Sequence, residues 1–148
     1  MEIAKKKAIQ AKLSNIEFIN SGFLTYEHHE PPVDIIISTA AFHHLPDFWK
    51  VIALLKMGKI LKVNGILFLS DVIFSFEPTE YASEVNTFLN GIKINTDAEF
   101  YNDGILHIKE EFSTFDWLMD EMFEHTGFNI LNKLKYSKTN IDYVGSKK

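Results

Sequence analysis

The sequence contains neither cysteine nor arginine among its 148 residues. Without cysteine the chain forms no disulfide, offers no thiolate to a metal ion and has no cysteine nucleophile. All fifteen cationic side chains are lysines, so no guanidinium is available to fork onto a phosphate or a guanine edge. The net charge is −5 and no basic stripe runs along the chain. These absences argue against a nucleic-acid partner.

Long apolar runs are also missing. The two longest, residues 34–38 and 65–76, are interrupted by polar residues, whereas a membrane helix needs about 20 apolar residues in a row. The lysines at 5–7 are followed by no apolar run, so the N-terminus does not read as a signal peptide. We therefore expect a cytoplasmic protein with no membrane partner. Its 46% apolar and 24% charged residues are typical of a globular domain.

The seven glycines are isolated from one another. No Gly-x-Gly-x-x-Gly turn, no P-loop and no Gly-x-Ser-x-Gly elbow occurs. An unrelated nucleotide-binding domain is therefore a weak hypothesis, because such domains hold phosphates on a glycine-rich loop at a helix N-terminus.

The six histidines include two adjacent pairs, His28-His29 and His43-His44. Neighbours in an extended chain point to opposite sides, and no His-x-x-x-His or Glu-x-x-His spacing is present. The spacing therefore predicts no metal site. Outside the second pair, we expect the histidines to lie in solvated loops or on the surface, His107 and His125 included.

Apolar periodicity divides the chain into helices and short β-branched runs. Strands that alternate with helices favour an α/β fold with a mostly parallel sheet and helices on both faces. The last two strands are joined too closely for a parallel crossover, so they form an antiparallel pair. A Ser113-x-x-Asp116 capping box is expected to open the last helix. The predicted strands are 16–20, 33–38, 66–72, 128–135 and 141–146; helices are expected at 2–12, from Asp47 to the Asn64-Gly65 stop, from Pro78-Thr79 to Gly91 and up to Gly127, and residues 92–109 are ambiguous.

His43 and His44 stand out by position, since they follow a buried strand and precede a helix. Ligands of open α/β sheets bind beyond the carboxyl ends of the strands, where a histidine can orient or deprotonate a substrate. The alternative is that one ring packs on the next helix and the other meets water. Asp71 ends the neighbouring strand at the same edge. It either contacts a substrate or caps the next turn, and the sequence does not decide between these roles.

Three segments resemble the class I S-adenosylmethionine-dependent methyltransferases. Residues 33–47, VDIIISTAAFHHLPD, look like the fourth-strand motif of that family. Residues 60–67, ILKVNGIL, resemble its stretch leading into the fifth strand, and 16–24 resemble its third strand and adenine-contacting turn. The resemblance implies one domain over 1–148 with a partial Rossmann-like methyltransferase fold. The family's first two strands and its glycine-rich cofactor turn have no counterpart here.

The resemblance also implies S-adenosylmethionine as cofactor and a small molecule as methyl acceptor. Gly22 and Phe23 match the adenine turn, where Gly22 stands at a position that is often aspartate in the family. His43 and His44 match positions that face the substrate, and we expect His44, or else His43, to act as the base. Residues 77–110 fall where substrate-covering segments insert. The remaining matches are Ser38, Thr39 and Ala40 for the methionine part of the cofactor, and Tyr81, Phe88 and Tyr101 as lid aromatics.

The absent strands have a structural consequence. In the family they lie between the third and fourth strands, so residues 33–38 become an edge that is prone to aggregation unless covered. The chain then re-pairs its strands, borrows strands from another copy or another chain, or is a fragment. We expect methyl transfer only with the missing N-terminal part or a partner, and a homo-oligomer is one way to cover the edge. A non-catalytic interaction module is the alternative function.

Overall fold

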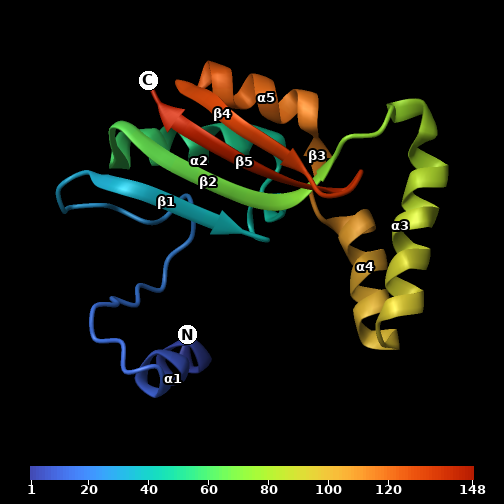
Figure 1. Cartoon of the computed structure of the whole chain (residues 1–148), viewed down its shortest axis with the longest axis horizontal. Helices are drawn as coiled ribbons and strands as arrows, with labels where there is room; N and C mark the ends of the chain where they lie inside the picture. Colours follow the sequence, from blue (N-terminus) through green and yellow to red (C-terminus); the bar gives the residue numbers. More distant parts are fainter.

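A computed structural model describes all of residues 1–148 (Figure 1). A mixed sheet with the strand order β1-β2-β5-β4 forms its centre, and the short β3 pairs with one end of β2. The elements are α1 (Glu2–Gln10), β1 (Val33–Thr39), η1 (Phe42–His44), α2 (Asp47–Ile60), β2 (Leu61–Phe74), η2 (Pro78–Glu80), α3 (Tyr81–Asn95), α4 (Ala98–Glu110), β3 (Thr114–Phe115), α5 (Asp116–His125), β4 (Phe128–Lys135) and β5 (Asn140–Lys147).

The strand directions confirm the predicted α/β class. β1 and β2 are parallel and are connected through α2, while β3 also runs parallel to β2. β4 and β5 form the predicted antiparallel pair, and β5 inserts between β4 and β2. β1 lies at the end of the strand order. The expectation that this strand becomes an edge is therefore confirmed.

The core lies on one face of the sheet. Leu67, Leu69 and Ile73 of β2 point to this face and are fully buried, while the alternate residues 68, 70 and 72 are only partly buried. Helices α2 and α5 both pack here and share one apolar cluster with β2 and β5. The expectation of helices on both faces is wrong, because the opposite face leaves Ile35 and Ile37 of β1 57% and 69% exposed.

Most of the first 32 residues lie outside this core, although Phe23 and Leu24 pack against it. Helix α1 lies away from the sheet at the end of a long irregular segment (Figure 1). Ala8 is the only buried residue in this region. The strand predicted at 16–20 does not form, since a strand needs a hydrogen-bonding partner and no strand of the sheet pairs with these residues.

Helices α3 and α4 form a hairpin that extends beyond one end of the sheet (Figure 1). The predicted stop at Gly91 is wrong, because α3 continues to Asn95. Asp97 then caps α4 by accepting a hydrogen bond from the Phe100 amide at 2.9 Å. The ambiguous stretch 92–109 is thereby resolved as helix, turn and helix. The predicted capping box at Ser113 is also wrong, since α5 begins without a side-chain cap.

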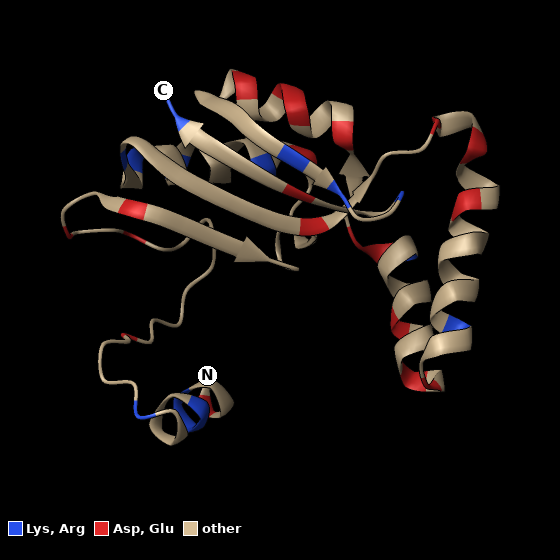
Figure 2. Ribbon diagram, in the orientation of Figure 1, with Lys and Arg blue, Asp and Glu red and all other residues tan.

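Charge is distributed unevenly over these parts (Figure 2). Acidic residues recur along α5 and on the α3–α4 hairpin, whereas α1 carries a cluster of lysines. None of the helices combines the length and the apolar character that crossing a membrane requires.

Candidate active site

The candidate site lies where β1 and β2 end, at their carboxyl edge. Past β1 the chain turns at Ala40, which adopts a left-handed backbone conformation with φ of 47°. The amide of Ala40 donates to the carbonyl of Ser70 at 2.8 Å, which ties the turn to β2. This turn feeds directly into η1 and brings His43 next to Asp71 of β2.

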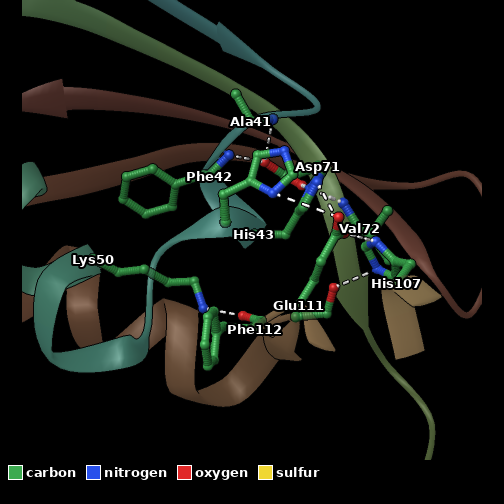
Figure 3. A network of polar contacts seen from close by, with 11 residues as sticks. Ala41, Phe42, His43, Lys50, Asp71, Val72, His107, Glu111 and Phe112 are labelled. Carbon is green, nitrogen blue, oxygen red and sulfur yellow. Dashed lines mark hydrogen bonds and ion pairs between the residues drawn. The ribbon is translucent and has the colours of Figure 1, made fainter. Parts of the chain in front are cut away.

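Asp71 organises the turn through its two carboxylate oxygens (Figure 3). Oδ2 accepts the amides of Ala41 at 3.2 Å and Phe42 at 2.6 Å. Oδ1 accepts the amide of Val72 at 2.7 Å and the Nδ1–H of His43. Burial acts to raise the pKa of Asp71, but these donors hold that pKa below its ordinary 3.8. Asp71 is therefore an anion that both caps a turn and orients an imidazole.

The hydrogen bond to Asp71 fixes the state of His43. With its hydrogen on Nδ1, the neutral ring has a free lone pair on Nε2. The same hydrogen bond raises the pKa of His43 from the ordinary 6.5, against the opposing effect of burial. The His43 side chain is only 8% exposed. This is the arrangement of an imidazole base that a carboxylate holds in place.

Glu111 lies on the other side of the imidazole. One of its oxygens, Oε2, is 3.3 Å from His43 Nε2 and also contacts Nδ1 of His107 (Figure 3). The other, Oε1, is 3.5 Å from Nδ1 of His44. Burial lowers the pKa of His107 despite the nearby Glu111 carboxylate, and Nε2 of that ring is 2.8 Å from the Ser113 hydroxyl. Three imidazoles thus converge on one carboxylate.

Backbone contacts hold Glu111 in place. The next residue, Phe112, donates its amide to the carbonyl of His43 at 2.8 Å. Its own carbonyl accepts from the ammonium group of Lys50, which is 1% exposed and also donates to Asp47 at 2.8 Å. The end of α4 is therefore attached to both η1 and α2.

A small cavity of about 250 Å³ opens between this cluster and the α3–α4 hairpin. Its apolar wall comes from the hairpin and includes Phe88, Ile92 and Phe100. Its polar end is formed by His43, His107 and Glu111, with Asp103 at the side. A small molecule in this cavity would have its polar group against the imidazoles.

The residues matched to the cofactor lie in two places. Gly22 and Phe23 line a larger groove of about 650 Å³ between the N-terminal segment and β1 with α2. Thr39, the last residue of β1, and Ala40, which follows it, are both exposed. Ser38 is 5% exposed, and its hydroxyl is buried without a hydrogen-bond partner.

The groove matches only one part of S-adenosylmethionine. Its walls are largely apolar, and Phe23 packs edge-to-face on Phe42 with ring centroids 5.4 Å apart. Such walls suit the faces of an adenine ring, and Glu17 is the one carboxylate at the rim that could accept from it or from a ribose. Nothing at the groove corresponds to a glycine-rich turn for the methionine part. The donor set therefore fits the adenosine half of the cofactor and not the sulfonium half.

His107 and Glu111 are the two members of the cluster that the sequence did not predict. The expectation that His107 lies at the surface is wrong, since its side chain is 12% exposed and contacts Glu111. The signal was the spacing of these two residues, since positions i and i+4 share one side of a helix. The packing of that side against His43 depends on the fold and was not visible in the chain.

Comparisons with known proteins agree with this architecture, although no family model matches the chain. An uncharacterized methyltransferase of Bacillus cereus (strain ATCC 10987) is 30% identical over 134 residues, which are 88% of this chain and 55% of the relative. The O-methyltransferase family 2 protein from Planctomyces limnophilus, solved with apigenin, superposes with a TM-score of 0.68 at 15% identity, over 99% of this chain and 39% of that one. LepI, solved with S-adenosylmethionine, gives 0.61 at 14% identity, over 96% and 34%.

The chain is a relative of the class I S-adenosylmethionine-dependent methyltransferases. It spans about half the length of the curated Bacillus cereus relative and about two fifths of the solved Planctomyces limnophilus chain.

Proposed function

We propose that this methyltransferase relative provides the acceptor side of an S-adenosylmethionine-dependent O-methyltransferase for a small hydroxylated molecule. The observation that supports this most is the His43–Asp71 pair, which faces a cavity at the carboxyl ends of two parallel strands. A hydroxyl acceptor suits a base of this kind, because the oxygen must lose its proton as the methyl group arrives. The O-methyltransferase among the solved relatives agrees with this choice.

Each residue of the cluster has a defined task in this proposal. The bound cofactor supplies an electrophilic methyl group. His43 Nε2 accepts the proton of the acceptor hydroxyl, and the Asp71 carboxylate stabilises the imidazolium that forms. Glu111, 3.3 Å from Nε2, adds a second negative charge beside that cation. A positioned base of this kind contributes about 10²–10⁴-fold to a rate.

The hairpin supplies the walls of the acceptor cavity. Phe88 and Phe100 line this cavity together with the imidazoles of His43 and His107, and their aromatic rings suit an apolar, aromatic acceptor. Closing such a cavity also removes water from the reacting atoms. Among the predicted lid aromatics, Phe88 lines the cavity, whereas Tyr81 is 64% exposed and Tyr101 lies beneath the ammonium group of Lys93.

In this proposal the cofactor site is formed by this chain together with a second polypeptide segment. The groove lined by Gly22 and Phe23 takes the adenosine part, and the groups that hold the methionine part come from a polypeptide segment beyond these 148 residues or from a partner chain. Activity therefore belongs to the completed protein. This follows from the partial fit of the groove and from the coverage of the relatives.

A second candidate function is a non-catalytic interaction module. The exposed edge of β1, with Ile35 57% and Ile37 69% exposed, favours it, since a partner could pair with this strand. This candidate gives no role to the cavity and its base. Binding of S-adenosylhomocysteine, the form of the cofactor that remains after methyl transfer, distinguishes the two functions, because only the methyltransferase is expected to bind it.

The test joins this chain to the segment of the Bacillus cereus relative that lies outside the aligned 134 residues. A cooperative unfolding transition qualifies the chimera for the assay. Calorimetry with S-adenosylhomocysteine should then show saturable binding to the chimera and none to the 148-residue chain by itself. A folded chimera that binds no S-adenosylhomocysteine would contradict the methyltransferase proposal and leave the interaction module.

A further inference from the structure

The imidazole cluster has a second chemical property that proton transfer does not use. One ring nitrogen of His43, one of His44 and a carboxylate oxygen of Glu111 all lie within 4.8 Å of one another. His43 Nε2 lies 3.3 Å from Oε2 of Glu111, and His44 Nδ1 lies 3.5 Å from Oε1 of the same carboxylate. Ligand atoms placed about 2.0–2.1 Å from a metal at tetrahedral angles are about 3.3–3.4 Å apart. Each nitrogen–oxygen contact is close to that separation, so the two imidazoles and the carboxylate lie near enough to share one ion.

The contact with Asp71 orients one of the candidate metal ligands, His43. Asp71 takes the Nδ1–H of His43, so the lone pair of Nε2 faces Glu111. A carboxylate behind a ligating histidine is the usual support of a metal site in proteins. Glu111 Oε2 is buried and contacts imidazole nitrogens, yet none of these contacts has the alignment of a hydrogen bond. His107 touches the same carboxylate from the side and holds it in place.

We propose that His43, His44 and Glu111 form a binding site for a divalent first-row transition metal, with Zn²⁺ or Co²⁺ as the fitting ions. Two imidazoles and one carboxylate suit these ions, while Mg²⁺ and Ca²⁺ prefer sites built from oxygen alone. Three protein ligands leave a fourth position for water or a hydroxyl group. His44 is 60% exposed, so the ion has a path from solvent.

Metal and proton compete for the same atom. The single lone pair of His43 Nε2 binds either a metal ion or the proton of an acceptor, so the filled site removes the base. This consequence rests on the proposed methyl transfer, whereas metal binding itself does not. We therefore expect Zn²⁺ to inhibit the completed enzyme, and a chelator to reverse the inhibition.

The test uses the untagged 148-residue chain and needs no methyl transfer. Co²⁺ is titrated while the visible absorption of the ion is recorded, and Zn²⁺ is titrated by calorimetry. One ion should bind per chain, and the Co²⁺ spectrum should show the intense bands of a four- or five-coordinate nitrogen and oxygen site. Failure to bind either ion would overturn the site whatever the fate of the proposed function.

Variants locate the ion. H44A should fold normally, since His44 is exposed, and should lower the Zn²⁺ affinity by at least about 10–100-fold. E111Q should lower it as well while it keeps the volume of the side chain. H29A is the matched control, because His29 is an exposed member of the other histidine pair, 3.8 Å from Glu27. Unchanged affinity in H44A, or a loss in H29A, would place the ion elsewhere and overturn the proposal.

Discussion

Residues 1–32 and 33–148 contain similar kinds of apolar residues but differ in whether those residues are buried. All fourteen members of the core cluster lie between Phe42 and Tyr143. In the first region Ile3 and Ile9 of α1 are 72% and 75% exposed. Burial against a second element, and not apolar character alone, therefore decides which part of the chain becomes packed structure. The candidate base belongs to the packed region, while the adenosine groove spans both regions.

The sharpest test of this difference is truncation of one apolar side chain in each region. Phe123 is fully buried and stacks on Tyr143 with ring centroids 5.1 Å apart. F123A should lower the free energy of unfolding by about 3–5 kcal/mol because it leaves a cavity. I9A should change it by less than about 0.5 kcal/mol. Urea denaturation followed by circular dichroism measures both, and similar losses in the two variants would mean that α1 shares the core.

The next comparison concerns charge. Asp116 accepts ion pairs from Lys133 at 3.1 Å and Lys135 at 2.7 Å in the packed region. Burial acts to raise the pKa of Asp116, but the two ammonium groups hold it below the ordinary 3.8. D116N should cost about 1.5–3 kcal/mol at neutral pH. D34N is the control, since its pair with Lys62 is exposed and should contribute less than about 1 kcal/mol.

The sign of the pH dependence follows from the lowered pKa of Asp116. Its stabilisation is complete above the unfolded-state pKa of 3.8 and is lost as the pH falls through the lower folded-state pKa. The stability difference between wild type and D116N should therefore shrink on acidification below that value. A difference that stays constant down to the acid transition would exclude this ion pair as its source.

Alanine substitutions at one glycine of the sheet and one of the hairpin compare how tightly the two parts are packed. A Cβ at Gly145 would come within 2.7 Å of the buried Phe123 ring, whereas a Cβ at Gly91 would meet no atom within 4 Å. G145A should destabilise the protein by about 1–3 kcal/mol through overpacking. G91A should stabilise it by about 0.4–1 kcal/mol, because alanine is the better residue inside a helix. Thermal unfolding measures both shifts, and a stabilising G145A would mean that the ring moves freely.

The smallest expected effect concerns mobility within the folded state. Backbone amides of β2 and β5 should exchange with solvent only through global unfolding, since these strands lie inside the sheet. Amides of residues 11–32 should exchange with little protection, because few of them donate to backbone carbonyls. Hydrogen exchange read by mass spectrometry compares the two. Strong protection across 11–32 would reveal a partner for that segment, such as a second copy of the chain.

Local chemistry predicted much of the fold. The strand predicted at 33–38 and the helix predicted from Asp47 both form, as β1 and α2. The face that α2 buries is a different one from its apolar stripe, since Lys50 is 1% exposed and Phe48 is 66% exposed. Residues 16–20 also predict a strand, yet they form none because their partner is absent. A strand forms with a neighbour, and a single segment does not reveal whether that neighbour exists.

The site was visible only in part. His43 and Asp71 could be placed at one sheet edge, because both follow or end parallel strands. Glu111 and His107 come from a helix whose docking depends on the amide of Phe112 and the ammonium group of Lys50. The contact between Lys50 and Phe112 joins residues 62 positions apart, and no local sequence pattern encodes it.

The central claim is that His43 removes a proton during methyl transfer. The most direct measurement follows labelled methyl groups from S-adenosylmethionine to a set of small phenols and alcohols, with the folded chimera as enzyme. The account predicts transfer by the parent, a loss of about 100-fold or more in H43A with S-adenosylhomocysteine binding retained, and full activity in H29A. Transfer that persists in H43A, or none by a chimera that binds the cofactor product, would contradict it.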